Sequence, residues 1–219
     1  MDSALSVLKK VSLFDGIGEN EIETMLKCFC ARTTHYNKNE SVLLEGDPAE
    51  SIGIVLSGRV QILKDDFYGD RSIVASAAEG EIFAEAFACA GVQSLPVSVF
   101  ASEESTVMFI AYRKLMTPCH EACAHHNRLI RNLLHTVARK NMVLNQKLEV
   151  LSKRTTKEKL IAYLSHEAKK AGKNRFEIPY NRQELADYLG VDRSAMSAEL
   201  SKLRDAGVIE FQRSRFRLK

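Results

Sequence analysis

Residues 182–203, RQELADYLGVDRSAMSAELSKL, restrict the fold of this chain more than any other stretch. Apolar side chains recur at helical spacing on both sides of a glycine, with Leu185, Ala186 and Leu189 before it and Met196, Leu200 and Leu203 after it. Gly190 allows the positive φ that a tight turn needs, and the small side chain of Ala186 lets two helices cross closely. The pattern predicts a helix-turn-helix, with an ordinary helical hairpin as the alternative.

The start of the second helix is the part of such a motif that enters a DNA major groove. Asp192 or Ser194 can cap this helix, because both carry a side-chain oxygen that accepts from free backbone amides. Glu199 occupies a position that is usually apolar, which predicts a slightly rotated second helix. The residues of this motif that we expect to contact DNA are Arg182, Gln183, Arg193, Ser194, Ser197, Ala198 and Lys202.

The net charge of +3 hides an asymmetry between the two halves of the chain. Residues 1–117 hold 10 Lys and Arg against 17 Asp and Glu, a net charge of −7, whereas residues 118–219 hold 21 against 11, a net charge of +10. A basic half that carries a helix-turn-helix suits a polyanion, because neutralised phosphates release counterions. Ordinary surface solubility is the alternative explanation.

With 219 residues and 45% hydrophobic content, the chain can bury a substantial core in one to two domains. Its apolar runs are short and no charged start precedes an apolar block, so we expect no membrane span, no signal peptide and a cytoplasmic location. Five cysteines, an odd number without secretion signals, favour reduced thiols over a disulfide framework.

Residues 1–117 are expected to form an antiparallel β-roll or jelly roll after two short helices at 5–14 and 19–29. Runs rich in Val and Ile predict strands at residues 41–44, 52–56, 60–63, 72–75 and 106–110. Glycines recur every 11 or 12 residues between residues 46 and 91, which is the rhythm of one strand and one turn. A dinucleotide fold is not expected, because the strands do not alternate with long helices and no GxGxxG occurs.

We expect no enzyme, and no catalytic or metal-binding residue is assigned. A metal enzyme built on such a barrel needs several His and carboxylate ligands inside it, and the strand region offers only His35 at its margin. No nucleophile with an adjacent base stands out. Binding is therefore the expected role of this part of the chain.

Residues 118–152 are predicted to form one long helix that pairs with a second copy of the chain. Two lines of residues repeat every seven positions and are offset by three, which is the a/d pattern of a coiled coil. Asn141 within this seam would fix the register and favour two parallel helices. The expected dimer contacts are Ile130, Leu134, Val137, Asn141, Leu144, Leu148 and Leu151. An amphipathic helix that lies on its own barrel is the alternative.

Four thiol and imidazole side chains gather near the start of this helix, at Cys119, His120, Cys123 and His126. Thr117 can cap a helix that begins with Pro118, and the helix dipole there favours the thiolate form of a cysteine. The cluster suits a redox pair, a metal site or part of a haem pocket. Thiols packed where the helix meets the barrel are the simpler interpretation.

Residues 153–219 are predicted to form a separate winged helix-turn-helix domain. A first helix reaches residue 171, residues 176–178 form a short strand, and residues 208–211 and 215–218 form a hairpin wing. Arg213, Arg215 and Arg217 of this wing can touch phosphates, and such contacts position a protein on DNA without reading its sequence.

Together, an α+β chain with a β-roll, a long dimer helix and a winged helix-turn-helix resembles the CRP/FNR superfamily of bacterial transcription regulators. The segment NRQELADYLG at residues 181–190 is similar to the DNA-binding motif of that family, and GEIFAEAF at residues 80–87 looks like the phosphate-binding cassette of its cyclic-nucleotide-binding members. The resemblance implies a homodimer on a palindromic double-stranded operator, with RNA polymerase as a further partner.

Within the second helix of the motif, Arg193 matches a base-reading arginine of the cyclic-AMP regulator and Ser197 a base-contacting serine of the oxygen-sensing branch. Ser194 and Ala198 differ from the residues of those proteins, so we expect a different operator. A bidentate contact from Arg193 to a guanine would contribute about 1–3 kcal/mol of discrimination.

Departures from the family pattern argue against cyclic AMP as the effector. Leu95-Pro96 stands where those members carry the Arg-Ser or Arg-Thr that holds the phosphate, and Ala84-Glu85 where they carry Gly-Glu. A buried cyclic phosphate would therefore lack its charge-assisted partner. Leu144 and Asn145 also replace the Thr-Ser pair that contacts adenine from the dimer helix.

We therefore expect a homodimeric transcription regulator whose β-roll senses a signal and whose long helix transmits it to the winged domains. One candidate signal is a small molecule held near Glu81, Glu85, Leu95, Leu144 and Asn145. The other is a redox, nitric oxide or haem event at the Cys119–His126 cluster, which leaves haem as an open cofactor. Cys28 and Cys30 are too few for an iron–sulfur cluster of the family's oxygen sensors. A ligand-binding scaffold that does not regulate transcription is the alternative from another class.

Overall fold

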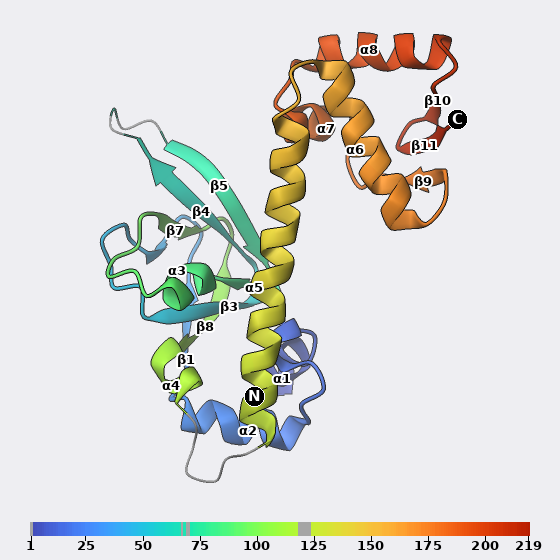
Figure 1. The fold of residues 1–219 in the computed structure, drawn as a ribbon. Helices are drawn as coiled ribbons and strands as arrows, with labels where there is room; N and C mark the ends of the chain where they lie inside the picture. The colour runs from blue at the N-terminus through green and yellow to red at the C-terminus, as the bar shows by residue number, and fades with distance from the viewer. Residues whose placement is uncertain (1, 67, 69–70, 118–123) are drawn as a thin grey trace. The chain divides into compact units, whose positions relative to one another are not determined.

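The computed structural model describes residues 2–66, 68, 71–117 and 124–219. The chain forms two compact units, Met1–Arg139 and Lys140–Lys219, whose helices and strands are drawn in Figure 1. Each unit has its own apolar core. The three-part division into residues 1–117, 118–152 and 153–219 stays a prediction. Within the described ranges no helix is both long and apolar enough to cross a membrane.

The first unit contains short helices around a β-roll. Its helices are α1 Asp2–Leu8, the 3-10 turn η1 Ser12–Phe14, α2 Glu19–Cys28, α3 Glu85–Ala90, α4 Tyr112–Met116 and the first part of α5 Ala124–Leu151. Its strands are β1 Arg32–Tyr36, β2 Ser41–Leu43, β3 Ser51–Ser57, β4 Arg59–Asp65, β5 Arg71–Ala78, β6 Ile82–Phe83, β7 Ser98–Ala101 and β8 Ser105–Ala111.

The strands form two antiparallel four-stranded sheets, in the orders β1-β8-β3-β6 and β2-β7-β4-β5. This confirms the predicted β-roll, and the five expected strands correspond to β2, β3, β4, β5 and β8. Apolar side chains from both sheets form a buried cluster inside the roll, among them Val55, Phe83 and Val99. Phe83 lies edge-on to Phe109 at 6.2 Å, and a Cβ added at Gly53 would lie 2.2 Å from the Phe83 ring, so this close approach requires glycine.

The single helix expected at residues 5–14 is wrong, because α1 ends at Leu8 and a separate turn η1 follows. Val11, Leu13 and Phe14 are all buried. One continuous helix would direct Val11 and Leu13 to opposite sides, so the break lets all three side chains enter the core.

Thr117 lies directly after α4, and its Oγ1 donates to the carbonyl of Arg113 at 2.7 Å. The helix start expected at Pro118 lies outside the described residues, so the cap by Thr117 stays a prediction. In the described part of the chain α5 begins at Ala124. Its early turns are held by Asn132, whose amide donates to the carbonyls of Leu13 (3.0 Å) and Asp15 (2.9 Å).

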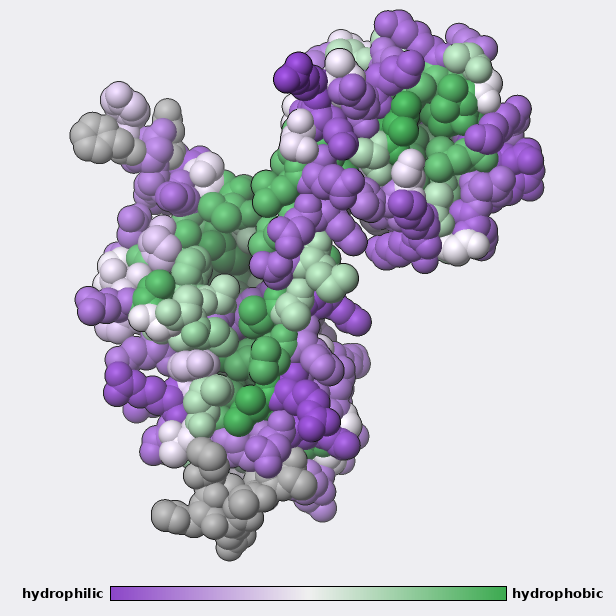
Figure 2. Space-filling view, in the orientation of Figure 1, coloured by the Kyte–Doolittle hydropathy of each residue, from purple (hydrophilic) through white to green (hydrophobic). Residues whose placement is uncertain are grey.

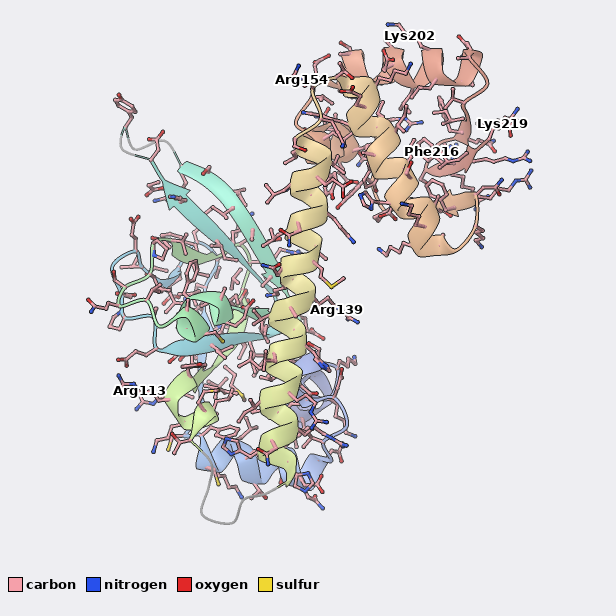
Figure 3. The ribbon with its side chains drawn as sticks, viewed as in Figure 1. Arg113, Arg139, Arg154, Lys202, Phe216 and Lys219 are labelled. Atoms are coloured by element: carbon pink, nitrogen blue, oxygen red, sulfur yellow. The ribbon has the colours of Figure 1, made fainter. Side chains whose placement is uncertain are left out.

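The second unit contains the last turns of α5 and the winged helix-turn-helix predicted from the sequence. Its further elements are α6 Thr156–Ala171, β9 Arg175–Glu177, α7 Arg182–Leu189, α8 Arg193–Asp205, β10 Ile209–Gln212 and β11 Arg215–Leu218. The strands pair in the order β10-β11-β9. Phe216 lies on the inner side of this small sheet, toward α6 (Figure 3), and is 3% exposed.

Candidate nucleic-acid interface

The turn between α7 and α8 is fixed by its backbone and by two helix caps. Gly190 has φ +58°, and the nearest atom to an added Cβ would be Leu151 Cδ2 at 3.8 Å, so positive φ and not lack of space requires glycine here. Asn181 caps α7 by accepting from the amides of Gln183 (2.9 Å) and Glu184 (3.0 Å). Asp192, one of the two candidates, caps α8 by accepting from the amide of Ala195 at 2.8 Å.

The first turn of α8 presents side chains that can approach a polyanion. Arg193 is the first residue of the helix and is exposed, at the end where the helix dipole is positive. Ser194 Oγ instead donates to Asp192 Oδ1 at 2.5 Å, so its hydroxyl proton serves the cap. Arg193 is thus the best placed of the predicted base contacts.

The remaining side chains of α8 lie either on its buried side or on its exposed side. Met196, Leu200 and Leu203 are buried in the core of the unit. Ala198 is exposed and Ser197 is half-buried. Lys202 points outward from α8 in Figure 3, and its Nζ lies 3.3 Å from Glu199 Oε2. The side chain of Glu199 is only 20% exposed, which agrees with its position next to the apolar side of the helix.

Because Asp192 caps α8 with an ionised carboxylate, the folding stability of this unit should depend on pH. Hydrogen bonds from Ser194 and from the amide of Ala195 hold the pKa of the Asp192 carboxyl below its ordinary value. Because this pKa is lower in the folded than in the unfolded state, the ionised carboxylate stabilises the fold at pH values above the pKa of the unfolded state. This contribution is lost as the pH falls below about 4. We expect Asp192→Ala to lower the thermal midpoint at pH 7 and to flatten the acid limb of a melting series. Asp192→Asn is the matched control, because asparagine caps equally well without titrating; it should keep the midpoint at pH 7 and still flatten the acid limb. An acid limb unchanged in both variants would contradict this role.

Of the three wing arginines that were predicted to touch phosphate, two already have carboxylate partners. Arg215 Nε lies 3.4 Å from Glu177 Oε2, and Arg217 lies 3.4 Å from Glu210 Oε2. Arg213 is exposed in the turn between β10 and β11, at φ +53°. Sequence reasoning missed Glu177 and Glu210, because only the strand register places them beside these arginines.

The two remaining candidates stand at the start of α7. Gln183 is exposed, and its amide donates to Asp187 Oδ1 at 2.9 Å. Arg182 is half-buried, with its guanidinium 4.8 Å from the centre of the Phe211 ring and 5.4 Å from that of Phe216. Burial lowers the pKa of Arg182, which still leaves a charged group at neutral pH. This geometry does not favour Arg182 as a phosphate ligand.

The residues predicted to contact a second copy fall into two groups. Leu134, Leu144 and Leu148 are 65%, 60% and 63% exposed, and apolar surface is visible along α5 in Figure 2. Asn141 is exposed and accepts from the Asn145 amide at 2.8 Å. By contrast, Ile130 and Val137 are half-buried and pack against the core of the first unit, as the alternative of a helix lying on its own barrel implies. Leu151 is half-buried as well.

The effector candidates are divided between the two units. In the first unit, Glu85 is 4% exposed at the start of α3 and Leu95 is 2% exposed. The Glu81 carboxylate accepts from the amide of Ala78 at 2.8 Å. Leu144 and Asn145 belong to the second unit, and their place in one site with the others stays a prediction.

Of the thiol and imidazole cluster, Cys119, His120 and Cys123 lie outside the described residues. His126 is 5% exposed, its Nε2 lies 2.5 Å from the carbonyl oxygen of Leu115, and its ring is edge-on to Phe29 at 5.5 Å. This nitrogen is thus engaged by the backbone, which does not favour it as an iron ligand. Among the described residues no group of three His, Cys, Asp or Glu is arranged for a metal ion.

Comparison with known families covers both units. Residues 33–121 match the cyclic nucleotide-binding domain, and residues 158–219 match the Crp-like helix-turn-helix domain. The chain belongs to the CRP/FNR family of transcription regulators. It is 23% identical over 186 residues to the transcriptional activator protein FnrA of Stutzerimonas stutzeri, which covers 83% of this chain and 74% of that protein. It is 24% identical over 199 residues to the electron transport regulator A of Shewanella oneidensis, covering 89% of this chain and 77% of that protein.

Solved structures of the family share the fold. The catabolite activator protein of Thermus thermophilus superposes with a TM-score of 0.55 at 20% identity, over 95% of this chain and 93% of that chain. DNR from Pseudomonas aeruginosa superposes with a TM-score of 0.50 at 21% identity, over 98% of this chain and 92% of that chain. The family consists of regulators and not of enzymes, in agreement with the sequence-based expectation.

Proposed function

We propose that this regulator acts as a homodimer in the cytoplasm, that it reads a palindromic DNA operator with α8, and that its first unit responds to a signal other than cyclic AMP. The observation that carries this proposal is the first turn of α8, where Asp192 caps the helix and leaves Arg193 exposed at its N-terminus. Bound at such an operator, the protein would contact RNA polymerase.

Two further features support the dimer and the DNA contact. The exposed leucines of α5 leave apolar area that a second helix could cover, and apolar burial is the main driving force of association. The net charge of +10 on residues 118–219 favours a polyanion. A two-fold dimer would place two α8 helices on half-sites about one helical turn apart.

Selection of bound fragments from a random-sequence DNA library tests the proposal. We expect the enriched sequences to share a palindrome with a guanine in each half-site. Enrichment of a single asymmetric site, or of no sequence at all, would overturn it.

Cyclic AMP should neither bind this chain nor change its affinity for DNA. Leu95 is buried where the cyclic-AMP-binding members carry an arginine, and its backbone is held by hydrogen bonds with Gly46 (2.9 Å) and Asp47 (2.8 Å). A cyclic phosphate at this position would be desolvated against an apolar side chain. Calorimetric titration with millimolar cyclic AMP should show no binding heat, and the thermal midpoint should not move. Saturable binding with a micromolar Kd would refute this prediction.

Two classes of signal stay open, an organic ligand near Glu81 and Glu85 or a redox, nitric oxide or haem event at the cysteine cluster. The visible absorption spectrum of freshly purified protein separates them. A Soret or iron–sulfur band would favour the second class, and a colourless, metal-free protein would favour the first.

A further inference from the structure

The aromatic side of the wing joins three elements that lie apart in the sequence. Phe211 on β10 and Phe216 on β11 face each other across the hairpin, with ring centres 5.7 Å apart. The guanidinium of Arg182, from the start of α7, lies over both rings. The guanidinium of Arg204, from the last turn of α8, lies 5.8 Å from the centre of the Phe211 ring. Both helices of the motif therefore contact the same aromatic pair.

The contact between Arg182 and the rings is a partly desolvated cation–π interaction. Arg182 is half-buried, and such contacts strengthen as water is excluded from the cation. No ion pair with a carboxylate is found for Arg182 among the described residues, so the rings are the partners that account for its position. Arg204 differs, because it also pairs with Asp205 at 3.0 Å.

The strand register links this contact to the tip of the wing. Phe211 pairs with Phe216, the next pair is Gln212 with Arg215, and the turn with Arg213 follows directly. Anchoring the Phe211–Phe216 pair therefore determines where Arg213 stands relative to α8. A wing that pivots on the helices would carry Arg213 away from the phosphate that it is proposed to contact.

We propose that Arg182 is a positioning residue, which fixes the wing to the helix-turn-helix through Phe211 and Phe216, and that it is not a phosphate ligand. This rests on the proposed DNA binding. The guanidinium is planar and stacks on aromatic rings, whereas the lysine ammonium is a compact, strongly hydrated charge. Lysine is a good phosphate ligand but a poor replacement in such a stack.

Operator affinity at several salt concentrations distinguishes the two roles of Arg182. If Arg182 positions the wing, Arg182→Lys and Phe211→Leu should each lower operator affinity about 5- to 10-fold, and the double variant should lose no more than the larger single effect. Both single variants should also reduce the salt slope by about one phosphate contact per protomer, that of Arg213. In a phosphate-ethylation interference experiment, Arg182→Lys and Phe211→Leu should each lose the signal at one phosphate. This should be the same phosphate at which Arg213→Gln loses its signal.

Lys169→Gln is the matched control, since it removes an exposed positive charge from the last turn of α6, and the cations found over these rings are Arg182 and Arg204. It should leave the interference pattern unchanged. If Arg182→Lys keeps the wild-type affinity and slope while Arg182→Gln loses one contact and Phe211→Leu loses none, Arg182 binds phosphate and the proposal is overturned.

Hydrogen exchange in the absence of DNA tests the anchor by itself. Arg182→Lys should accelerate exchange of the amides of β10 and β11, whereas Lys169→Gln should not. Unchanged exchange in Arg182→Lys would overturn the proposal. A wild-type protein that shows this anchor but binds no DNA would refute the proposed function and leave the anchor intact.

Discussion

Leu148→Glu should convert the proposed dimer into folded monomers and lower operator affinity by about 10²–10⁴-fold. In a dimer, binding of one DNA-binding domain holds the second one at a high effective concentration near its half-site. Monomers lose this effect, which accounts for the size of the expected loss. Leu148 is 63% exposed in the single chain, so a glutamate at this position should hardly lower the folding stability of one protomer. In a paired seam, however, two glutamates would face each other and be desolvated. Sedimentation equilibrium with the operator titration measures both effects.

Met142→Glu is the matched control for this substitution. Met142 lies on the same helix and is 62% exposed, but it stands outside the predicted heptad positions. Its variant should stay dimeric and bind the operator like the wild type. Equal effects of the two substitutions, or a Leu148→Glu protein that remains a dimer, would count against the predicted seam.

Arg193→Ala should abolish most of the preference for the operator over a scrambled duplex. A bidentate arginine–guanine pair provides about 1–3 kcal/mol of discrimination for each half-site, or about 5- to 150-fold. The scrambled duplex should lose much less affinity, because it loses only the charge of the side chain.

Lys169→Ala removes the same charge from an exposed position on α6 and should leave the ratio of the two affinities unchanged. Competition titrations with both duplexes give this ratio directly. If Arg193→Ala weakens binding to the two duplexes equally, Arg193 contacts phosphate and another residue reads the bases.

Much of the helix-turn-helix could be predicted from the sequence, because the signals that define it are local. Gly190 and the cap Asp192 act within a few residues of their own positions, and the apolar spacing of α7 and α8 gives their buried sides. Arg182 shows the limit of this reasoning. Its position in the motif suggests a DNA contact, but its environment is set by Phe211 and Phe216, which only the folded wing places beside it.

Five strands of the β-roll were predictable from their apolar runs, and β1, β6 and β7 were missed. β7 has an apolar alternation, but it is only four residues long. β1 reads RTTHY and is largely exposed, and β6 has two residues, so neither gives a periodic apolar signal. The long helix illustrates a different limit. Its heptad pattern treats Ile130 and Leu134 alike, yet Ile130 packs on its own unit and Leu134 is exposed. A seven-residue repeat does not say whether its partner is the same chain or another one.

The affinity for the selected operator and for a scrambled duplex, measured from low to high salt, tests the central claim most directly. We predict that binding to both weakens steeply with salt, with a slope of about −0.9 for each phosphate contacted, and that the operator is bound about 10³-fold or more tightly at each concentration. Weak binding without a salt slope, or equal affinity for both duplexes, would contradict the assignment of this chain as a sequence-specific DNA reader.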